Sequence, residues 1–224
     1  MHAAKERILA QAKSLGFDVA GFADPRAIES AGRDLHDFLA RGYHGDMHWM
    51  ADRAALRSSP STLWPEAKSA IVVGHNYAPP ENPLYKLADK NLGNISCYAH
   101  GKDYHDVMKK KLRQLARWIS EEFDCDVKLF VDTAPVMEKP LAQAAGIGWQ
   151  GKHTCLVSRE FGSWLFIGSV FTTLDLFPSP LEGESQGGGA SHTMNDFLAP
   201  TPLPSLKERE NHIDHCVSCT RCLD

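Results

Sequence analysis

Long apolar runs are missing from this sequence of 224 residues. A membrane-spanning helix needs about 20 consecutive apolar residues, and the longest candidate, 64–77, is interrupted by Glu66, Lys68 and His75. Residues 1–6 contain no apolar core of a signal peptide. We therefore expect a cytoplasmic protein that makes no membrane contact. With 43% apolar and 23% charged residues, global disorder is excluded.

An excess of positive charge is also missing. The chain has 24 Lys and Arg against 28 Asp and Glu, for a formal net charge of -4. A protein that clamps nucleic acid over its whole surface is normally basic, because phosphate neutralisation supplies most of its affinity. The charge balance excludes a general nucleic-acid clamp and leaves a local basic patch open.

Cysteines are few, and half of them are concentrated at one end. Cys97, Cys125 and Cys155 are scattered, and their default interpretation is as small buried apolar residues. The other three fall within the last nine residues. Without a secretory signal, a disulfide framework is not expected.

The terminal cysteines have a spacing that is typical of metal clusters. Cys216, Cys219 and Cys222 form Cys-x2-Cys-x2-Cys, which is the opening of the bacterial ferredoxin run. This spacing predicts three ligands of a [4Fe–4S] cluster. Zinc stays open, because His212 or His215 offers a fourth ligand. The sequence stops at 224, before the expected fourth cysteine, so we expect 207–224 to be the truncated start of a ferredoxin-like domain.

Apolar periodicity predicts alternating helices and strands before that point. We expect helices at 4–15, 35–42 and 104–123, a fourth helix ending at Gly146, and strands at 19–23, 69–77 and 127–131, with 154–158 and 163–172 paired as a hairpin. This order predicts an α/β protein, an α+β sandwich with a mostly buried sheet. Residues 178–206 contain five Pro, four Gly and four Ser, which predicts a disordered linker or insertion.

Two central segments are candidates for function. Asp132 follows the strand predicted at 127–131, where α/β sheets commonly carry ligands, but it also suits a turn or the N-cap of the next helix. Residues 145–154 hold three glycines in six positions, which lets the backbone approach a large flat or anionic ligand. The segment is neither a Walker loop nor G-x-G-x-x-G.

Together these segments resemble the epoxyqueuosine reductases, which are cobalamin-dependent and iron–sulfur-dependent enzymes of tRNA queuosine synthesis. The resemblance rests on five blocks in order: 57–60 with 64–68, 98–105, 131–135, 145–154 and 216–224. It implies a cobalamin-binding catalytic domain at 1–177, related to nitroreductase-like folds, followed by the linker 178–206 and the ferredoxin-like start at 207–224.

The same resemblance implies a set of site residues. Asp132 is expected to protonate the oxygen that leaves when epoxyqueuosine in the tRNA wobble position is reduced to queuosine. Electrons are expected to pass from [4Fe–4S] clusters to cobalamin, with Cys216, Cys219 and Cys222 as cluster ligands. The residues expected at the cobalamin are Arg57, Cys97, Asp132, Lys139, Gln150, Gly151, Lys152, His153 and Thr154.

The resemblance also sets expectations about partners. We expect tRNA containing epoxyqueuosine to bind mainly through parts that this sequence lacks. We also expect the protein to be a monomer that receives electrons from an unidentified donor, and this chain alone to be inactive. Three alternatives remain open: another corrinoid and iron–sulfur reductase, similar to reductive dehalogenases; a non-catalytic corrinoid- or flavin-binding module; and a zinc-stabilised interaction protein.

Overall fold

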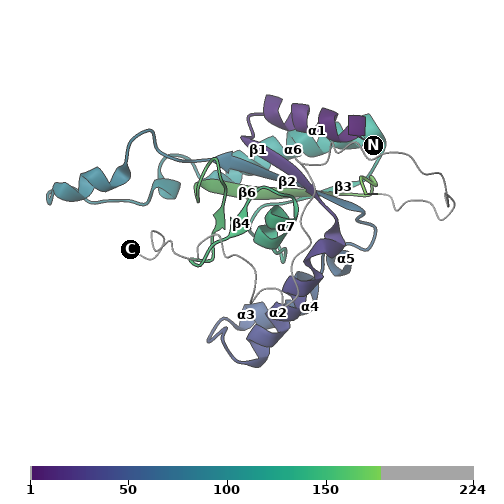
Figure 1. Cartoon of the computed structure of the whole chain (residues 1–224), viewed down its shortest axis with the longest axis horizontal. Coiled ribbons are helices and arrows are strands. Elements are labelled where there is room, and N and C mark those ends of the chain that lie inside the picture. Colours follow the sequence, from purple (N-terminus) through teal and green to yellow (C-terminus); the bar gives the residue numbers. More distant parts are fainter. Residues whose placement is uncertain (1, 178–224) are drawn as a thin grey trace, which may run out of the picture.

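A four-stranded antiparallel sheet lies at the centre of the computed structural model, which describes residues 2–177 (Figure 1). Its strand order is β1-β2-β6-β3, and every neighbouring pair is antiparallel. The strands are β1 (Val19–Ala23), β2 (Ser69–Asn76), β6 (Leu165–Thr172) and β3 (Val127–Phe130). The fold is therefore mixed α/β, as the sequence predicts.

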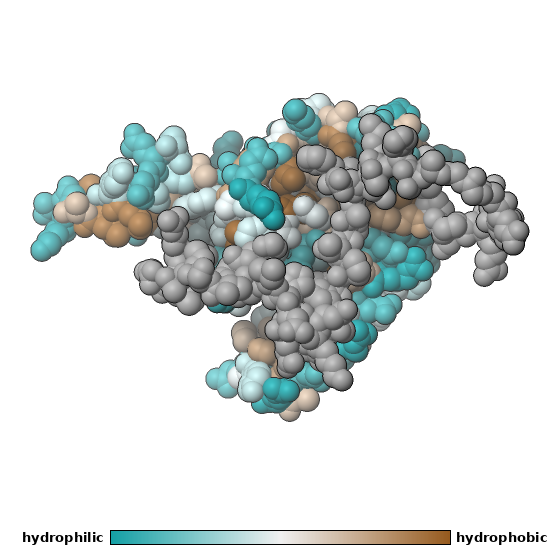
Figure 2. Space-filling model, viewed as in Figure 1, coloured by the Kyte–Doolittle hydropathy of each residue, from teal (hydrophilic) through white to brown (hydrophobic). Residues whose placement is uncertain are grey.

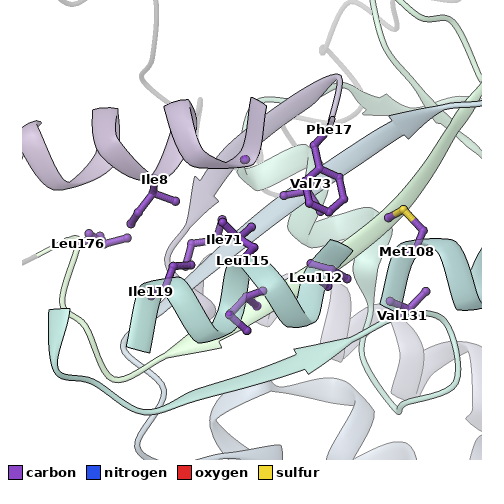
Figure 3. Packing of buried hydrophobic residues seen from close by; sticks show 13 residues of the cluster. Ile8, Phe17, Ile71, Val73, Met108, Leu112, Leu115, Ile119, Val131 and Leu176 are labelled. Atoms are coloured by element: carbon purple, nitrogen blue, oxygen red, sulfur yellow. The ribbon is translucent and has the colours of Figure 1, made fainter. Parts of the chain in front are cut away.

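The central strand β2 is apolar along most of its length because helices cover both faces of the sheet. Successive side chains of a strand point to opposite faces. Ile71 and Val73 pack in one cluster, whereas Ala70 and Val72 pack in a second cluster on the other face. The first face is covered by α1 (His2–Ser14) and α6 (Tyr104–Phe123), and the second by α7 (Glu138–Ala144) (Figures 1 and 3).

Helix α6 lies close to the sheet at a glycine of β6. A Cβ atom on Gly168 would lie 2.6 Å from Leu112 Cδ1 and 3.2 Å from Met108 Cε. Both α6 side chains are fully buried. The missing side chain at Gly168 thus permits the helix packing that places the N-terminus of α6 near the end of β3.

Two groups of short elements extend from the sheet. The 3-10 helix η1 (Pro25–Ile28) leads into helices on the α7 side (Figure 1). Those helices are α2 (Glu29–Ala40), α3 (His48–Asp52), α4 (Ala54–Ser58) and α5 (Pro60–Leu63). From one end of the sheet extends an arm that contains η2 (Pro83–Ala88) and η3 (Cys97–Ala99), and its exposed apolar residues include Leu84, Tyr85 and Leu92 (Figures 1 and 2).

The predicted hairpin of 154–158 with 163–172 is wrong. β5 (Leu156–Val157) pairs with β4 (Trp149–Gln150), while β6 pairs with β2 and β3. Only an isolated bridge between Ser158 and Gly162 resembles the expected pairing. The long apolar strand β6 buries more surface between β2 and β3 than a local hairpin allows, so tertiary packing overrides the local turn.

The other predicted helices and strands are confirmed within two residues at their ends, except that the helix predicted at 35–42 begins six residues earlier, as α2 (Glu29–Ala40). The short helices α3 to α5 were not predicted, because each has at most five residues and no periodic apolar face. Within residues 2–177, no helix combines the length and the hydrophobicity that crossing a bilayer requires. The predicted segments 178–206 and 207–224 lie outside the described residues.

Candidate active site

Asp132 lies in the loop that follows the edge strand β3, with its side chain 62% exposed. Its backbone is in the left-handed region, at φ 56°, which is uncommon for a residue with a side chain. Its backbone N–H donates to both carboxylate oxygens of Glu138, at 3.2 Å each. Ligands favour the carboxyl ends of strands in open, mostly parallel sheets, but this sheet is antiparallel. The position of Asp132 is set instead by the loop and by Glu138.

His105 lies between two carboxylates. Its Nδ1 is 2.8 Å from Asp103 Oδ1, and its Nε2 is 3.1 Å from Asp132 Oδ2. Asp103 is also the N-cap of α6 and accepts the backbone N–H of His105 at 2.9 Å. The helix N-terminus therefore fixes the imidazole, and the imidazole reaches across to the loop after β3.

Tyr104 joins the same acid to a column of aromatic rings. Its hydroxyl donates to Asp132 Oδ2 at 3.0 Å. Its ring stacks on His105 at a centroid distance of 4.0 Å and on Phe166 of β6 at 4.1 Å. Phe166 in turn stacks on Tyr77 at 4.2 Å. Sheet and helix together hold the tyrosine that contacts the acid.

A pocket of about 410 Å³ opens beside this column. Cys97 from the arm lies in its wall together with Tyr77, Tyr104 and Phe166. Tyr104 thus connects two residues expected at the cobalamin: it lines the pocket together with Cys97, and it donates to Asp132, which does not itself line the pocket.

The site contains three carboxyl groups near the His105 imidazole, those of Asp103, Asp132 and Glu138. Burial gives Glu138 a raised pKa, whereas the pKa of Asp103 is lowered by its hydrogen bonds with His105. The pKa of Glu138 is raised to about 7: burial is the main cause and the negative charge of Asp132 adds to it, while the Asp132 N–H and the charge of His105 oppose the rise. The hydrogen bonds to Asp103 and then to Asp132 raise the pKa of His105. Burial, followed by the hydrogen bond to Asp132, raises the pKa of Tyr104, so the phenol stays a proton donor. The cluster can hold protons near neutral pH.

The glycine-rich segment forms a tight turn between β4 and β5. The Gly151 N–H donates to Cys155 O, and the Thr154 N–H donates to Gly151 O, both at 2.9 Å. Lys139 of α7 donates from Nζ to Thr154 O at 2.8 Å. The Gln150 N–H donates to Gln143 Oε1 at 3.0 Å. Lys139, Gln150, Gly151, Lys152, His153 and Thr154 therefore lie close together, and their expected contact with cobalamin stays a prediction.

Internal packing explains two of the three glycines. A Cβ on Gly148 would lie 2.2 Å from Val157 O, and one on Gly151 would lie 2.6 Å from His153 Nδ1. His153 itself is held through Nε2, which is 2.9 Å from Ser163 Oγ. These two glycines are required by the close approach of the protein's own chain, rather than by a ligand alone.

Arg57 contacts neither Asp132 nor the glycine turn through a hydrogen bond or a ring contact among residues 2–177. Its guanidinium lies over Trp49, at 5.2 Å from the ring centroid, and its buried Nε has no hydrogen-bond partner. Cys216, Cys219 and Cys222 lie outside the described residues. In the described part, no group of three or more His, Cys, Asp or Glu side chains is arranged to hold a metal ion.

Sequence reasoning missed four members of the site: Asp103, Tyr104, His105 and Glu138. The segment 98–105 contributed to the family resemblance, but no role followed from it. One signal was available, because an aspartate just before the periodic helix 104–123 is a typical N-cap. The contacts of Tyr104, His105 and Glu138 with Asp132 depend on tertiary structure and have no local signature.

The fold and this cluster define an α/β protein in which an acid accepts a hydrogen bond from a tyrosine that lines an aromatic pocket. The family model described as epoxyqueuosine reductase QueG, DUF1730, matches residues 57–133. Curated epoxyqueuosine reductases are similar to the chain: that of Gloeobacter violaceus is 36% identical over 97% of this chain and 57% of its own length, and that of Vibrio cholerae is 38% identical over 93% and 50%.

Solved structures agree with these comparisons. A selenomethionine-labelled epoxyqueuosine reductase matches all of this chain and 52% of its own, with a TM-score of 0.69 and 25% identity. Another structure, of an epoxyqueuosine reductase with an epoxyqueuosine-modified tRNA-Tyr stem loop, matches with a TM-score of 0.68 over 51% of its chain. The chain is thus a relative of the epoxyqueuosine reductases and spans about half the length of the curated relatives it matches.

Proposed function

We propose that this chain provides the catalytic, cobalamin-binding part of an epoxyqueuosine reductase, a cytoplasmic oxidoreductase that converts epoxyqueuosine to queuosine in the wobble position of tRNA. One observation carries the proposal: the family-matched segment 57–133 includes the acid Asp132, which Tyr104 and His105 contact, and Tyr104 also lines the pocket with Cys97. A similar protein has been solved with an epoxyqueuosine-modified tRNA stem loop, which supports tRNA as the substrate.

Asp132 acts as the proton donor in this proposal. Reduction of the epoxide to an alkene consumes two electrons and two protons and releases its oxygen as water. Expelling that oxygen without a proton is costly, and a positioned general acid contributes roughly 10²–10⁴-fold to the rate. The exposed carboxyl of Asp132 faces the site, while Tyr104 and His105 orient it.

Several residues fit a cobalamin bound by the domain at 1–177, whose fold we propose to be nitroreductase-like. Arg57 Nε and His153 Nδ1 are buried nitrogens without hydrogen-bond partners among the described residues, and buried polar groups normally have partners. Amide groups of the corrin would satisfy such atoms. Cys97, Lys139 and the turn 150–154 complete the proposed contact set. When bound, cobalamin supplies the electrons to the substrate.

The remaining assignments follow from the resemblance. Residues 207–224 begin a ferredoxin-like domain, in which Cys216, Cys219 and Cys222 hold a [4Fe–4S] cluster that receives electrons from a separate donor. Residues 178–206 link it to the domain at 1–177, and the protein works as a monomer.

A chimera tests the chemical role of Asp132. Residues 1–177 replace the matching part of the full-length Gloeobacter violaceus relative, and the product queuosine is measured in tRNA that contains epoxyqueuosine. Asp132→Asn should lower turnover by about 10²–10⁴-fold. Asp126→Asn, at an exposed position just before β3, is the matched control and should leave turnover unchanged. Unchanged turnover in Asp132→Asn would refute the proton-donor role.

A further inference from the structure

Glu138 is the most buried ionisable group of the site, yet it belongs to none of the expected cofactor contacts. It begins helix α7, and its pKa stands at about 7 chiefly because of burial. A buried carboxyl group is costly unless hydrogen bonds compensate it. Among the described residues, its hydrogen-bond partner is the backbone N–H of Asp132, which lies 3.2 Å from each of its oxygens.

The backbone that Glu138 holds is unusual. Asp132 has a φ of 56°, a conformation that is uncommon for residues other than glycine, although aspartate and asparagine adopt it more readily than other residues do. The Thr133 N–H to Val131 O hydrogen bond, at 2.6 Å, closes a tight turn around Asp132. The Asp132 side chain leaves this turn toward Tyr104 and His105. The direction of the side chain thus depends on the turn, and the turn is fastened to α7 through Glu138.

We propose that Glu138 is a positioning residue: its carboxylate anchors the backbone of Asp132 to helix α7 and thereby directs the Asp132 carboxyl group toward Tyr104 and His105. This inference deepens the proposed function, on which it rests for the identity of Asp132 as the acid. The anchor itself is a property of the described chain and can be measured without cofactor or substrate.

The strength of the anchor depends on the charge of Glu138. A hydrogen bond to an ionised acceptor is about twice as strong as one to a neutral acceptor. Three titratable groups affect Glu138 or its surroundings: Asp132 and His105 act on it electrostatically, and Tyr104 is in turn affected by it. Ionised Glu138 should hold the turn firmly, and protonated Glu138 should hold it less firmly.

Nuclear magnetic resonance of the isotope-labelled chain tests the anchor. The side-chain carboxyl ¹³C shift of Glu138 and the backbone amide shift of Asp132 should titrate together, with a common midpoint near 7. In Glu138→Gln, the Asp132 amide should stop following that titration. A titration of the Asp132 amide that keeps its full size in Glu138→Gln would come from His105 and would overturn the proposal.

Amide hydrogen exchange gives a second readout. At a pH where Glu138 is ionised, the protection factor of the Asp132 amide should fall by about tenfold or more in Glu138→Ala, because a hydrogen bond to a charged acceptor is lost. Glu138→Gln keeps one acceptor oxygen and should give an intermediate value. Glu121→Gln, at an exposed position of α6, is the control and should match the wild type. Equal protection in all variants would overturn the anchor.

The two proposals fail in different ways. If Glu138→Ala does not fold, as judged by circular dichroism, the titration of Glu138→Gln decides the question on its own. A confirmed anchor together with unchanged turnover in Asp132→Asn would leave Glu138 as a holder of the turn and reject the reductase mechanism. A failed anchor together with inactive Asp132→Asn would reject the positioning role of Glu138 and leave Asp132 as the proton donor.

Discussion

The hydroxyl of Tyr104 donates a hydrogen bond to the carboxylate of Asp132 at 3.0 Å, across 28 positions of the sequence. The tyrosine begins helix α6, and the aspartate follows strand β3. The contact exists because α6 packs on the sheet, with its first residues beside the end of that strand. Core packing and the candidate acid are therefore linked directly.

Replacing Tyr104 by phenylalanine tests this link. Tyr104→Phe keeps the stack on Phe166 and removes the hydrogen bond to Asp132. We expect the free energy of unfolding to fall by about 0.5–1.5 kcal/mol in a denaturant titration. The control, Tyr85→Phe, changes a 76% exposed residue on the arm and should have almost no effect. A Tyr104→Phe protein as stable as the wild type would show that this hydrogen bond contributes nothing net.

Removal of the Asp103 carboxylate should lower the pKa of His105. The hydrogen bond to Asp103 is the largest cause of the raised pKa, followed by the hydrogen bond to Asp132. In Asp103→Asn, the ring resonances of His105 should titrate at a lower pH than in the wild type. Asp106→Asn, three residues further along the chain in the first turn of α6, leaves both hydrogen bonds of His105 in place and should not shift its titration. An equal shift of the His105 pKa in both variants would show that the loss of a nearby negative charge, rather than of the hydrogen bond to Asp103, causes the shift.

Glu138 makes stability depend on pH in a defined direction. Its pKa is about 7 in the folded protein against 4.5 ordinarily, so the folded state binds this proton more tightly. Its contribution is full below pH 4.5 and is lost as the pH rises toward 7. Relative to Glu138→Gln, the wild type should lose about 3 kcal/mol of unfolding free energy over that interval.

Urea titrations at several pH values measure this difference. His105 is present in both proteins, so its own titration is largely common to the two curves. A difference between wild type and Glu138→Gln that stays constant from pH 4.5 to 7 would contradict the assigned burial of Glu138.

Gly168 should not tolerate a side chain. In Gly168→Ala the added Cβ would meet Leu112 and Met108 in a fully packed cluster. Overpacking of this kind typically destabilises by about 1–3 kcal/mol. Gly93→Ala is the control, because its added Cβ would meet no atom within 4 Å. Thermal unfolding of the two variants compares them, and equal midpoints would contradict the close approach of α6 to β6.

Much of the fold was predictable from the sequence because its main elements have strong periodic patterns. The helix Tyr104–Phe123 has one apolar face, and the strand Ser69–Asn76 contains the continuous apolar run 70–73. The pairing of β5 with β4 was missed, since a two-residue strand leaves no periodic signal. The antiparallel direction of the sheet was equally hidden, because strand direction depends on connections and not on composition.

The candidate site was predictable only in part. Asp132, Lys139 and the glycine turn followed from the resemblance, and the structure places Lys139 against Thr154. His105 and Glu138 were not predicted, because their importance depends on distances to Asp132 that only the folded chain defines. Two glycines looked like ligand contacts, although backbone and side-chain packing already require them.

The most direct test of the central claim is an anaerobic titration of the purified chain with cob(II)alamin, followed by electron paramagnetic resonance. A base-off cobalt signal that saturates at one equivalent of cofactor is the predicted result, because it requires a competent corrin site. An unchanged spectrum of free cobalamin, from protein that circular dichroism shows to be folded, would contradict the assignment of this domain as a cobalamin-binding reductase domain.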